Sequence, residues 1–293
     1  MTPWHIVAVT AAVTLVALTG CSLYGFRHGN DLSLIDGYYG LASLVHGVLT
    51  LLLWHPLTAR GALLCGITAL WALGLGTQLG VRWYREKRQH GGDVRYRMTA
   101  DFLRLDHEPL GSRALHRLML YVTVALPQVL LIAVLNLPLQ FAIMTTTPGL
   151  SLLDYVGLAA VALGAVMEVS SNRQLARFRA HSQPGQTLMS GWWYWSRHPN
   201  YFGNTLVYAG CFLVALSDPS RWWTVVSPIV ILIVLRFVLG VRMTDDLMLE
   251  KRKDDPTYLR YVNDTPAFLP LPPPLRQIRQ RIVPPVSLPR SHN

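Results

Sequence analysis

Apolar runs of close to twenty residues alternate along this chain with short polar connections. An α-helix rises about 1.5 Å per residue, so a run of about twenty apolar residues can cross the hydrocarbon core of a bilayer. The pattern therefore predicts an all-α integral membrane protein with about seven transmembrane helices. The expected spans are Trp4–Tyr24, Leu34–Trp54, Gly61–Leu79, Leu115–Leu135, Leu152–Ser170, Tyr201–Leu216 and Trp222–Val241.

These runs organise the chain into one membrane domain, residues 1–270, and a Pro-rich basic tail, residues 271–293, which we expect to be disordered. Composition agrees, because only 14% of the residues are charged, against about a quarter in soluble domains. A net charge of +10 could suggest a nucleic-acid partner, but the cations cluster between the apolar runs. Membrane lipids are therefore the expected partner, and nucleic acids are not.

The placement of Lys and Arg predicts the orientation of the helices. Basic residues crowd the third connection, the fifth connection and the segment after the last span, whereas residues 118–172 contain neither Lys nor Arg. Because cytoplasmic loops carry the excess of basic residues, the N-terminus should lie outside and the C-terminus in the cytosol. Only Arg60 and Arg221 fall on the opposite side. The expected localisation is the plasma membrane of a bacterial cell.

The three cysteines, Cys21, Cys65 and Cys211, lie far apart inside apolar runs and lack the spacing of a metal site or a redox pair. We expect packed thiols and no metal. Residues Leu18–Cys21 resemble a lipoprotein cleavage site, but no Lys or Arg precedes them, as a signal peptide normally requires. An uncleaved first span is the expectation, with a lipidated Cys21 as the alternative.

The stretch Ser190–Asn204 combines several aromatic rings with Arg197 and His198. A proline favours the first turn of a helix, so Asn200 and Asn204 should lie one turn apart on one helix face. The basic pair would then flank a helix N-terminus, whose free N–H groups attract anions. We interpret the stretch as a polar mouth at the rim of a membrane bundle that accepts phosphate. The alternative is an interfacial anchor that only fixes depth.

Ionisable groups at membrane depth are costly, so each one is a functional candidate. Asp36 and Tyr39 are three residues apart in the second expected span, and Glu168 and Asn172 are four apart at the end of the fifth. Each pair should share a helix face. The alternative for both pairs is hydrogen bonding between helices.

The run Gly74–Leu79 is similar to a dinucleotide fingerprint but lacks its third glycine and does not follow a strand. Close packing of helices explains these glycines better. A dinucleotide bound by this chain would therefore be held by side chains of the bundle rather than by a Rossmann turn.

The residues Ser196–Gly203 resemble the steroid 5α-reductase superfamily, and most closely its mostly bacterial branch with the 3-oxo-5-alpha-steroid 4-dehydrogenase C-terminal-like domain. Four further segments match that branch in order, and the similarity covers most of the chain. These segments are Ser33–Gly40, Asp93–Tyr96, Glu168–Phe178 and the closing run from Tyr258 to Pro270.

The resemblance implies a membrane-embedded, NADPH-dependent reductase that acts on a carbon–carbon double bond conjugated to a carbonyl in a hydrophobic, steroid- or lipid-like substrate. It implies that Asn200 lies near the nicotinamide amide and that Asp36 and Tyr39 contact the substrate. The residues implied to bind the cofactor are Arg95, Glu168, Asn172, Arg197, His198, Asn200, Tyr201, Asn204, Tyr258 and Tyr261.

The chain departs from the branch at four positions. Asn172 and Asn204 replace carboxylates, Gln78 replaces an arginine, and Tyr39 replaces a tryptophan. The Gln-Glu pair that supplies the acid in the steroid enzymes has no match, so the catalytic acid is unassigned, with Tyr38, Tyr39 and Tyr84 as candidates. Two other functions stay open. One is S-adenosylmethionine-dependent methyl transfer of the isoprenylcysteine type, which shares the Arg-His-Pro-x-Tyr core, and the other is a non-catalytic member of the reductase family.

Overall fold

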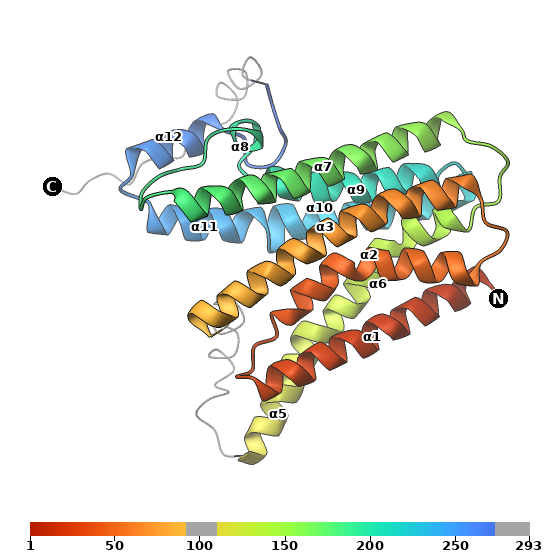
Figure 1. Cartoon of the computed structure of the whole chain (residues 1–293), viewed down its shortest axis with the longest axis horizontal. Helices are drawn as coiled ribbons and strands as arrows, with labels where there is room; N and C mark the ends of the chain where they lie inside the picture. Colours follow the sequence, from red (N-terminus) through yellow and green to blue (C-terminus); the bar gives the residue numbers. More distant parts are fainter. Residues whose placement is uncertain (92–109, 273–293) are drawn as a thin grey trace. The chain divides into compact units, whose positions relative to one another are not determined.

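The apolar runs fold as long helices in a computed structural model, which describes residues 1–91 and 110–272 (Figure 1). Within these ranges all regular secondary structure is helical, and there are no strands. The long helices are α1 (Pro3–Arg27), α2 (Leu34–Leu53), α3 (Ala59–His90), α6 (Leu126–Ile143), α7 (Leu152–His181) and α9 (Pro199–Ala215). Shorter elements are α5 (Leu110–Leu120), η1 (Tyr121–Ala125), α8 (Trp192–Trp195), η2 (Pro219–Val225), α10 (Val226–Ile233), η3 (Val234–Val238), α11 (Val241–Lys251) and α12 (Pro256–Asp264).

Six helical stretches among the described residues are long and apolar enough to cross a membrane, which gives the features of a multi-pass membrane protein. They are Pro3–Arg27, Leu34–Leu53, Ala59–Gln89, Arg117–Ile143, Leu152–His181 and Pro219–Lys251. Each corresponds to one of the seven predicted spans. The remaining prediction, Tyr201–Leu216, coincides with α9, whose 17 residues are fewer than the about twenty that a span needs. Seven spans and the orientation of the termini therefore stay predictions.

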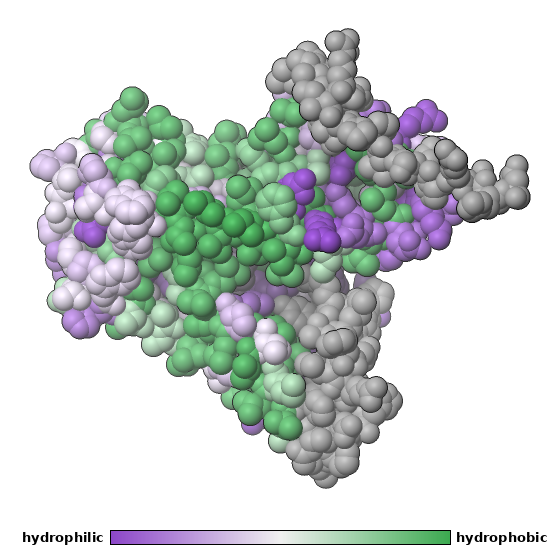
Figure 2. Space-filling view, turned by 180° about the vertical axis from the view of Figure 1, so that it is seen from behind, coloured by the Kyte–Doolittle hydropathy of each residue, from purple (hydrophilic) through white to green (hydrophobic). Residues whose placement is uncertain are grey.

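The outer surface of these helices is apolar, and some of their buried faces are polar. In α1 the buried residues include Thr10, Thr14 and Ser22, whereas Val16 and Leu23 are exposed. Figure 2 shows hydrophobic side chains covering a large area of one face. This inverted pattern is typical of helices whose solvent is lipid, because lipid chains accept apolar side chains while polar groups need partners inside the protein.

The chain forms two compact units, each considered by itself below. The first comprises residues 1–161 and 208–228, and the second comprises residues 162–207 and the part after 229. In the first unit, α1, α2, α3 and α6 pack against one another. Gly40 and Gly76 bring α2 and α3 into contact, because a Cβ added to Gly40 would lie 2.7 Å from the Gly76 Cα. This is the close helix packing expected for the glycines of the Gly74–Leu79 run.

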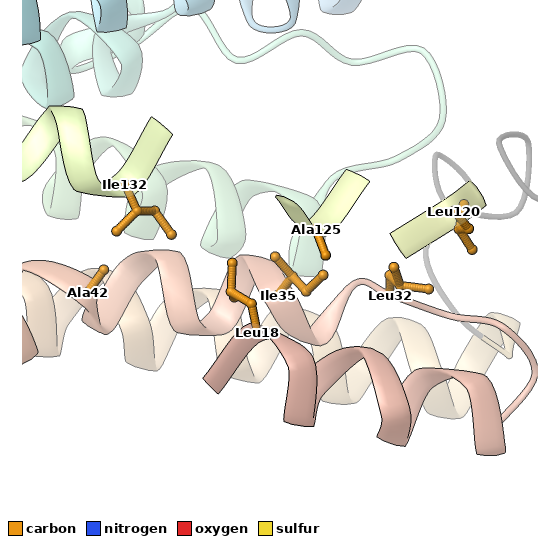
Figure 3. Packing of buried hydrophobic residues seen from close by; sticks show 7 residues of the cluster. All are labelled: Leu18, Leu32, Ile35, Ala42, Leu120, Ala125 and Ile132. Carbon is orange, nitrogen blue, oxygen red and sulfur yellow. The ribbon is translucent and has the colours of Figure 1, made fainter. Parts of the chain in front are cut away.

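An apolar core joins α1, α2 and the segment from α5 to α6 in this first unit (Figure 3). Its buried members are Leu18, Leu32, Ile35, Ala42, Leu120, Ala125 and Ile132. These side chains fix the packing of the consecutive helices α1 and α2 against a segment that is distant in sequence.

A polar chain lies within the same helices. Thr14 Oγ1 of α1 is 3.0 Å from the Tyr38 hydroxyl and 2.9 Å from His46 Nε2, both on α2. Gln140 of α6 donates to Thr10 Oγ1 at 2.7 Å. Thr10, Thr14, His46 and Gln140 are all fully buried. Hydrogen bonds between side chains thus add to apolar packing in joining α1, α2 and α6.

The two arginines that depart from the topology pattern are each paired with an aspartate. Arg60, at the start of α3, forms an ion pair with Asp154, and Arg221 forms one with Asp218. Their charges are largely compensated locally, which reduces their conflict with the distribution of the other basic residues.

Candidate functional site

The second unit contains the aromatic–arginine stretch and the polar end of α7, which two glycines bring together. Gly164 of α7 and Gly203 of α9 face each other. A Cβ added to Gly164 would lie 2.6 Å from the Gly203 carbonyl oxygen, and one added to Gly203 would lie 2.7 Å from the Gly164 carbonyl oxygen. Only glycine allows this approach, so the two backbones touch and the next polar side chains can meet across the interface.

Glu168 and Asn204 form the first polar pair beyond the glycines. Asn204 Nδ2 lies 3.1 and 3.2 Å from the two carboxylate oxygens of Glu168 and donates to them. The two residues are only 4% and 3% exposed. A carboxylate at this depth needs donors, and the amide of Asn204 supplies one.

Asn172 and Asn200 form the second pair, one helical turn from the first pair. This turn lies toward the C-terminus of α7 and toward the N-terminus of α9. Asn200 Nδ2 donates to Asn172 Oδ1 at 3.0 Å. The other end of the Asn200 amide, Oδ1, is buried and has no hydrogen-bond partner. The predicted faces of α7 and α9 therefore meet in two hydrogen-bonded pairs, which we call rungs: Glu168–Asn204 is the first and Asn172–Asn200 the second. The second rung leaves one acceptor unsatisfied.

Arg197 holds the C-terminal segment with its terminal nitrogens. Nη1 donates to the carbonyl oxygens of Val262 and Thr265, and Nη2 donates to Asp245 Oδ2 at 2.6 Å. The backbone N–H of Arg197 also donates to the Pro266 carbonyl at 2.9 Å. In this geometry the guanidinium fixes the chain itself, and its predicted contact with a cofactor stays a prediction.

His198 is held by three neighbours. Its Nε2 lies 2.8 Å from Asp245 Oδ1, its backbone N–H donates to Ser196 Oγ, and its ring stacks on Tyr201 with 5.3 Å between centroids. His198 is buried, whereas Tyr201 is half-buried. Asp245 is thus a member of the site that sequence reasoning missed. The available signal was an acidic side chain directly after the apolar run of the last span.

The two tyrosines of α12 support the site from the C-terminal side. Tyr261 donates from its hydroxyl to the Trp193 carbonyl at 2.8 Å. Tyr258 lies beneath the Arg252 guanidinium, 4.7 Å from the ring centroid. Burial, with the nearby charge of Asp245, raises the pKa of the Tyr258 phenol above its ordinary value. Both predicted residues lie in the same unit as the two rungs, and their contacts give them a supporting role.

The aromatic stretch is bound to α7 at several points. Trp192 donates from its indole to Ser170 Oγ at 2.7 Å, and Trp193 donates from its indole to the Ser171 carbonyl at 3.1 Å. Gln174 Oε1 accepts from the backbone N–H of Trp192. Tyr194 and Trp195 remain exposed. The first half of the stretch is therefore fixed to α7 by hydrogen bonds, and its role as an interfacial anchor stays an alternative.

Three other predicted site residues are not among the described residues of the second unit. Asp36 and Tyr39 lie on α2 in the first unit, where both are half-buried. Arg95 lies outside the described residues. Within residues 1–91 and 110–272 there is no group of three His, Cys, Asp or Glu residues that could hold a metal ion.

Six apolar helical stretches among the described residues, with one acid–amide and one amide–amide rung, define the class: a multi-pass helical membrane protein with a polar site in its second unit. Residues 26–265 match the family model described as "Protein of unknown function (DUF1295)", and the chain belongs to that family. The matched range includes all the site residues named above. Comparisons with curated proteins and with solved structures find no match.

Proposed function

We propose that this protein is a membrane-embedded reductase of the steroid 5α-reductase type, which uses NADPH to reduce a carbon–carbon double bond conjugated to a carbonyl in a hydrophobic substrate. Two lines support the proposal. The Arg-His-Pro-Asn-Tyr core and the four ordered segments resemble that superfamily. The rungs of α7 and α9 offer polar atoms suited to a nicotinamide nucleotide.

The observation that carries the proposal is the unsatisfied Oδ1 of Asn200. A buried acceptor without a donor destabilises a protein by about 1–3 kcal/mol, so a ligand that supplies a donor is favoured there. The carboxamide of nicotinamide has two N–H donors. Asn172 occupies the Asn200 amide nitrogen, which leaves the oxygen for the ligand. The residues present therefore fit the coenzyme.

Phosphate binding is assigned to α7 beyond the rungs. Arg173 and Arg177 follow Asn172 on the same helix, one turn apart, and both are exposed. A guanidinium binds phosphate through two parallel N–H groups, which suits the additional 2′-phosphate of NADPH. We infer that these two side chains bind phosphate groups of the coenzyme.

When bound, the coenzyme supplies the hydride, and the protein orients it and excludes water. In this proposal Asn200 orients the nicotinamide through its carboxamide, and the buried Glu168–Asn204 rung keeps Asn200 and its helix in register. Asp36 and Tyr39 are proposed to contact the substrate. The acid that polarises the substrate carbonyl is unassigned, and the substrate class is no narrower than steroid- or lipid-like.

Ligand-dependent thermal unfolding of the detergent-purified protein tests the proposal. NADPH at a hundred times its Kd should stabilise the protein by about 2.7 kcal/mol, and S-adenosylmethionine should have no effect. Stabilisation by S-adenosylmethionine alone would favour the methyltransferase. The absence of an effect from any nucleotide at millimolar concentration would favour a non-catalytic protein.

A further inference from the structure

Asp245 binds Arg197 and His198 at the same time. Its Oδ2 accepts from Arg197 Nη2 at 2.6 Å and its Oδ1 accepts from His198 Nε2 at 2.8 Å. A carboxylate has no hydrogen to donate, so the proton in the second bond belongs to Nε2. In a neutral imidazole the other nitrogen, Nδ1, then carries the lone pair and acts as an acceptor.

The charge of this cluster is balanced with the imidazole neutral, because one carboxylate already pairs with one guanidinium. The side chains of Arg197, His198 and Asp245 are largely buried, between 6% and 16% exposed. Geometry and charge therefore both select the tautomer with hydrogen on Nε2.

The lone pair of His198 Nδ1 is available to a ligand. Among the residues that the structure describes, none donates a hydrogen bond to it. The ring cannot easily turn, since Asp245 holds one edge and Tyr201 stacks on one face with an interplanar angle of 1°. The atom is thus an acceptor with a fixed direction.

We propose that Asp245 is a positioning residue that makes His198 a hydrogen-bond acceptor for the bound coenzyme, with Nδ1 as the accepting atom. This inference rests on the proposed function. Nδ1 of His198 and Oδ1 of Asn200 lie two residues apart in sequence at the start of α9, and both are acceptors. Each atom therefore recognises an N–H or O–H donor of the coenzyme, such as its carboxamide or ribose hydroxyls.

The same reasoning places the phosphates elsewhere. A phosphate oxygen is an acceptor and would repel the lone pairs of both atoms, and three of the five N–H groups of Arg197 already donate within the chain. The stretch with Arg197 and His198, which the sequence suggested for anions, therefore binds the uncharged part of the nucleotide that carries hydrogen-bond donors.

Nitrogen NMR of the full-length protein labelled on histidine tests the tautomer without any ligand. The His198 signal, assigned with His198→Gln, should show hydrogen on Nε2 and a lone pair on Nδ1. In Asp245→Asn the new amide can donate as well as accept, so the two tautomers should mix. Asp246→Asn is the matched control, because it removes the same charge from an exposed neighbour. Hydrogen on Nδ1 in the wild type would overturn the inference.

Titration with NADPH tests the role in binding. The Nδ1 signal should move as the coenzyme binds, and Asp245→Asn should weaken binding by about tenfold, the value of one hydrogen bond, while Asp246→Asn should not. If Asp245→Asn does not fold, the wild-type titration decides the question together with Asp245→Glu, which keeps the carboxylate. A wild type that binds no NADPH overturns the proposed function as well. Binding of NADPH with an unmoved Nδ1 signal overturns this inference alone.

Discussion

Arg60 and Asp154 form a bidentate ion pair, with Nε–Oδ1 and Nη2–Oδ2 distances of 2.7 and 3.0 Å. Both side chains are almost completely buried, and Arg60 also donates to the carbonyl oxygens of Thr147 and Gly149. The pair therefore joins the start of α3 to the start of α7 and to the loop before it. This contact lies within the first unit.

Removal of one partner should strongly destabilise the first unit. Arg60→Met leaves the Asp154 carboxylate buried without its main donor, which should lower the free energy of unfolding by about 3–5 kcal/mol. Arg60→Met combined with Asp154→Leu should recover much of this loss. Thermal unfolding in detergent measures both. Arg82→Met is the control, since Arg82 pairs with Glu86 on the exposed face of α3 and should matter by at most about 1 kcal/mol.

The close approach of α7 and α9 should be essential for the site. Gly203→Ala places a methyl group 2.7 Å from the Gly164 carbonyl oxygen, so the helices must separate and the rungs must loosen. We expect a lower melting temperature and weaker nucleotide binding. The control is Gly66→Ala on α3, where nothing lies within 4 Å of the added methyl, and which should be neutral or stabilising by about 0.5–1 kcal/mol. Equal effects of the two substitutions would contradict the assigned contact.

The first rung can be tested by exchanging its two groups. Asn204→Asp replaces the donor that faces Glu168 with an acceptor of the same shape, which should destabilise the protein by at least about 2 kcal/mol. Glu168→Gln in the same chain restores a donor and should recover most of the loss. A double variant no more stable than Asn204→Asp would show that the rung contributes through something other than this hydrogen bond.

The second rung should matter for binding more than for folding. Asn200→Ala removes the unsatisfied acceptor together with the bond to Asn172, so NADPH affinity should fall by about tenfold or more while the melting temperature changes little. Isothermal titration and thermal unfolding separate the two quantities. Thr205→Ala is the matched control on α9, because the Thr205 hydroxyl bonds only to its own helix, at the Tyr201 carbonyl.

Helix α12 should loosen in acid. The hydrogen bond from the Arg252 side chain holds the pKa of Asp255 below its ordinary value, and the backbone N–H groups of Tyr258 and Thr257 add to the effect. A lowered pKa means that the carboxylate stabilises the fold above about pH 4, the unfolded value, and that this contribution is lost as the pH falls through the folded value. Asp255→Asn should remove this pH dependence of stability below about pH 4.

The sequence predicted the helices well because the apolar runs are long. It ended several of them too early, and α3 and α7 are two examples. Helix α3 continues to His90 and α7 to His181, well beyond the apolar residues, because a helix that has left the lipid can continue with a polar surface, as the Arg82–Glu86 pair illustrates. Gly91, with a positive φ of 74°, ends α3.

The site was predictable only within single helices. Spacing placed Glu168 with Asn172 on one face, and Asn200 with Asn204 on another. It could not give the register between the helices, which pairs Glu168 with Asn204 and Asn172 with Asn200. That register depends on the contact between Gly164 and Gly203. The bonds from Arg197 and His198 to Asp245 join residues nearly fifty positions apart in sequence.

The polar chain of the first unit has a practical consequence for anyone who redesigns the amino-terminal helix. Thr10 and Thr14 are the contacts that α1 offers to Gln140 and His46. A generic polyleucine helix would insert into a bilayer equally well. It would leave the His46 imidazole and the Gln140 amide buried without their threonine partners. Chimeras that exchange this helix should therefore preserve both hydroxyls.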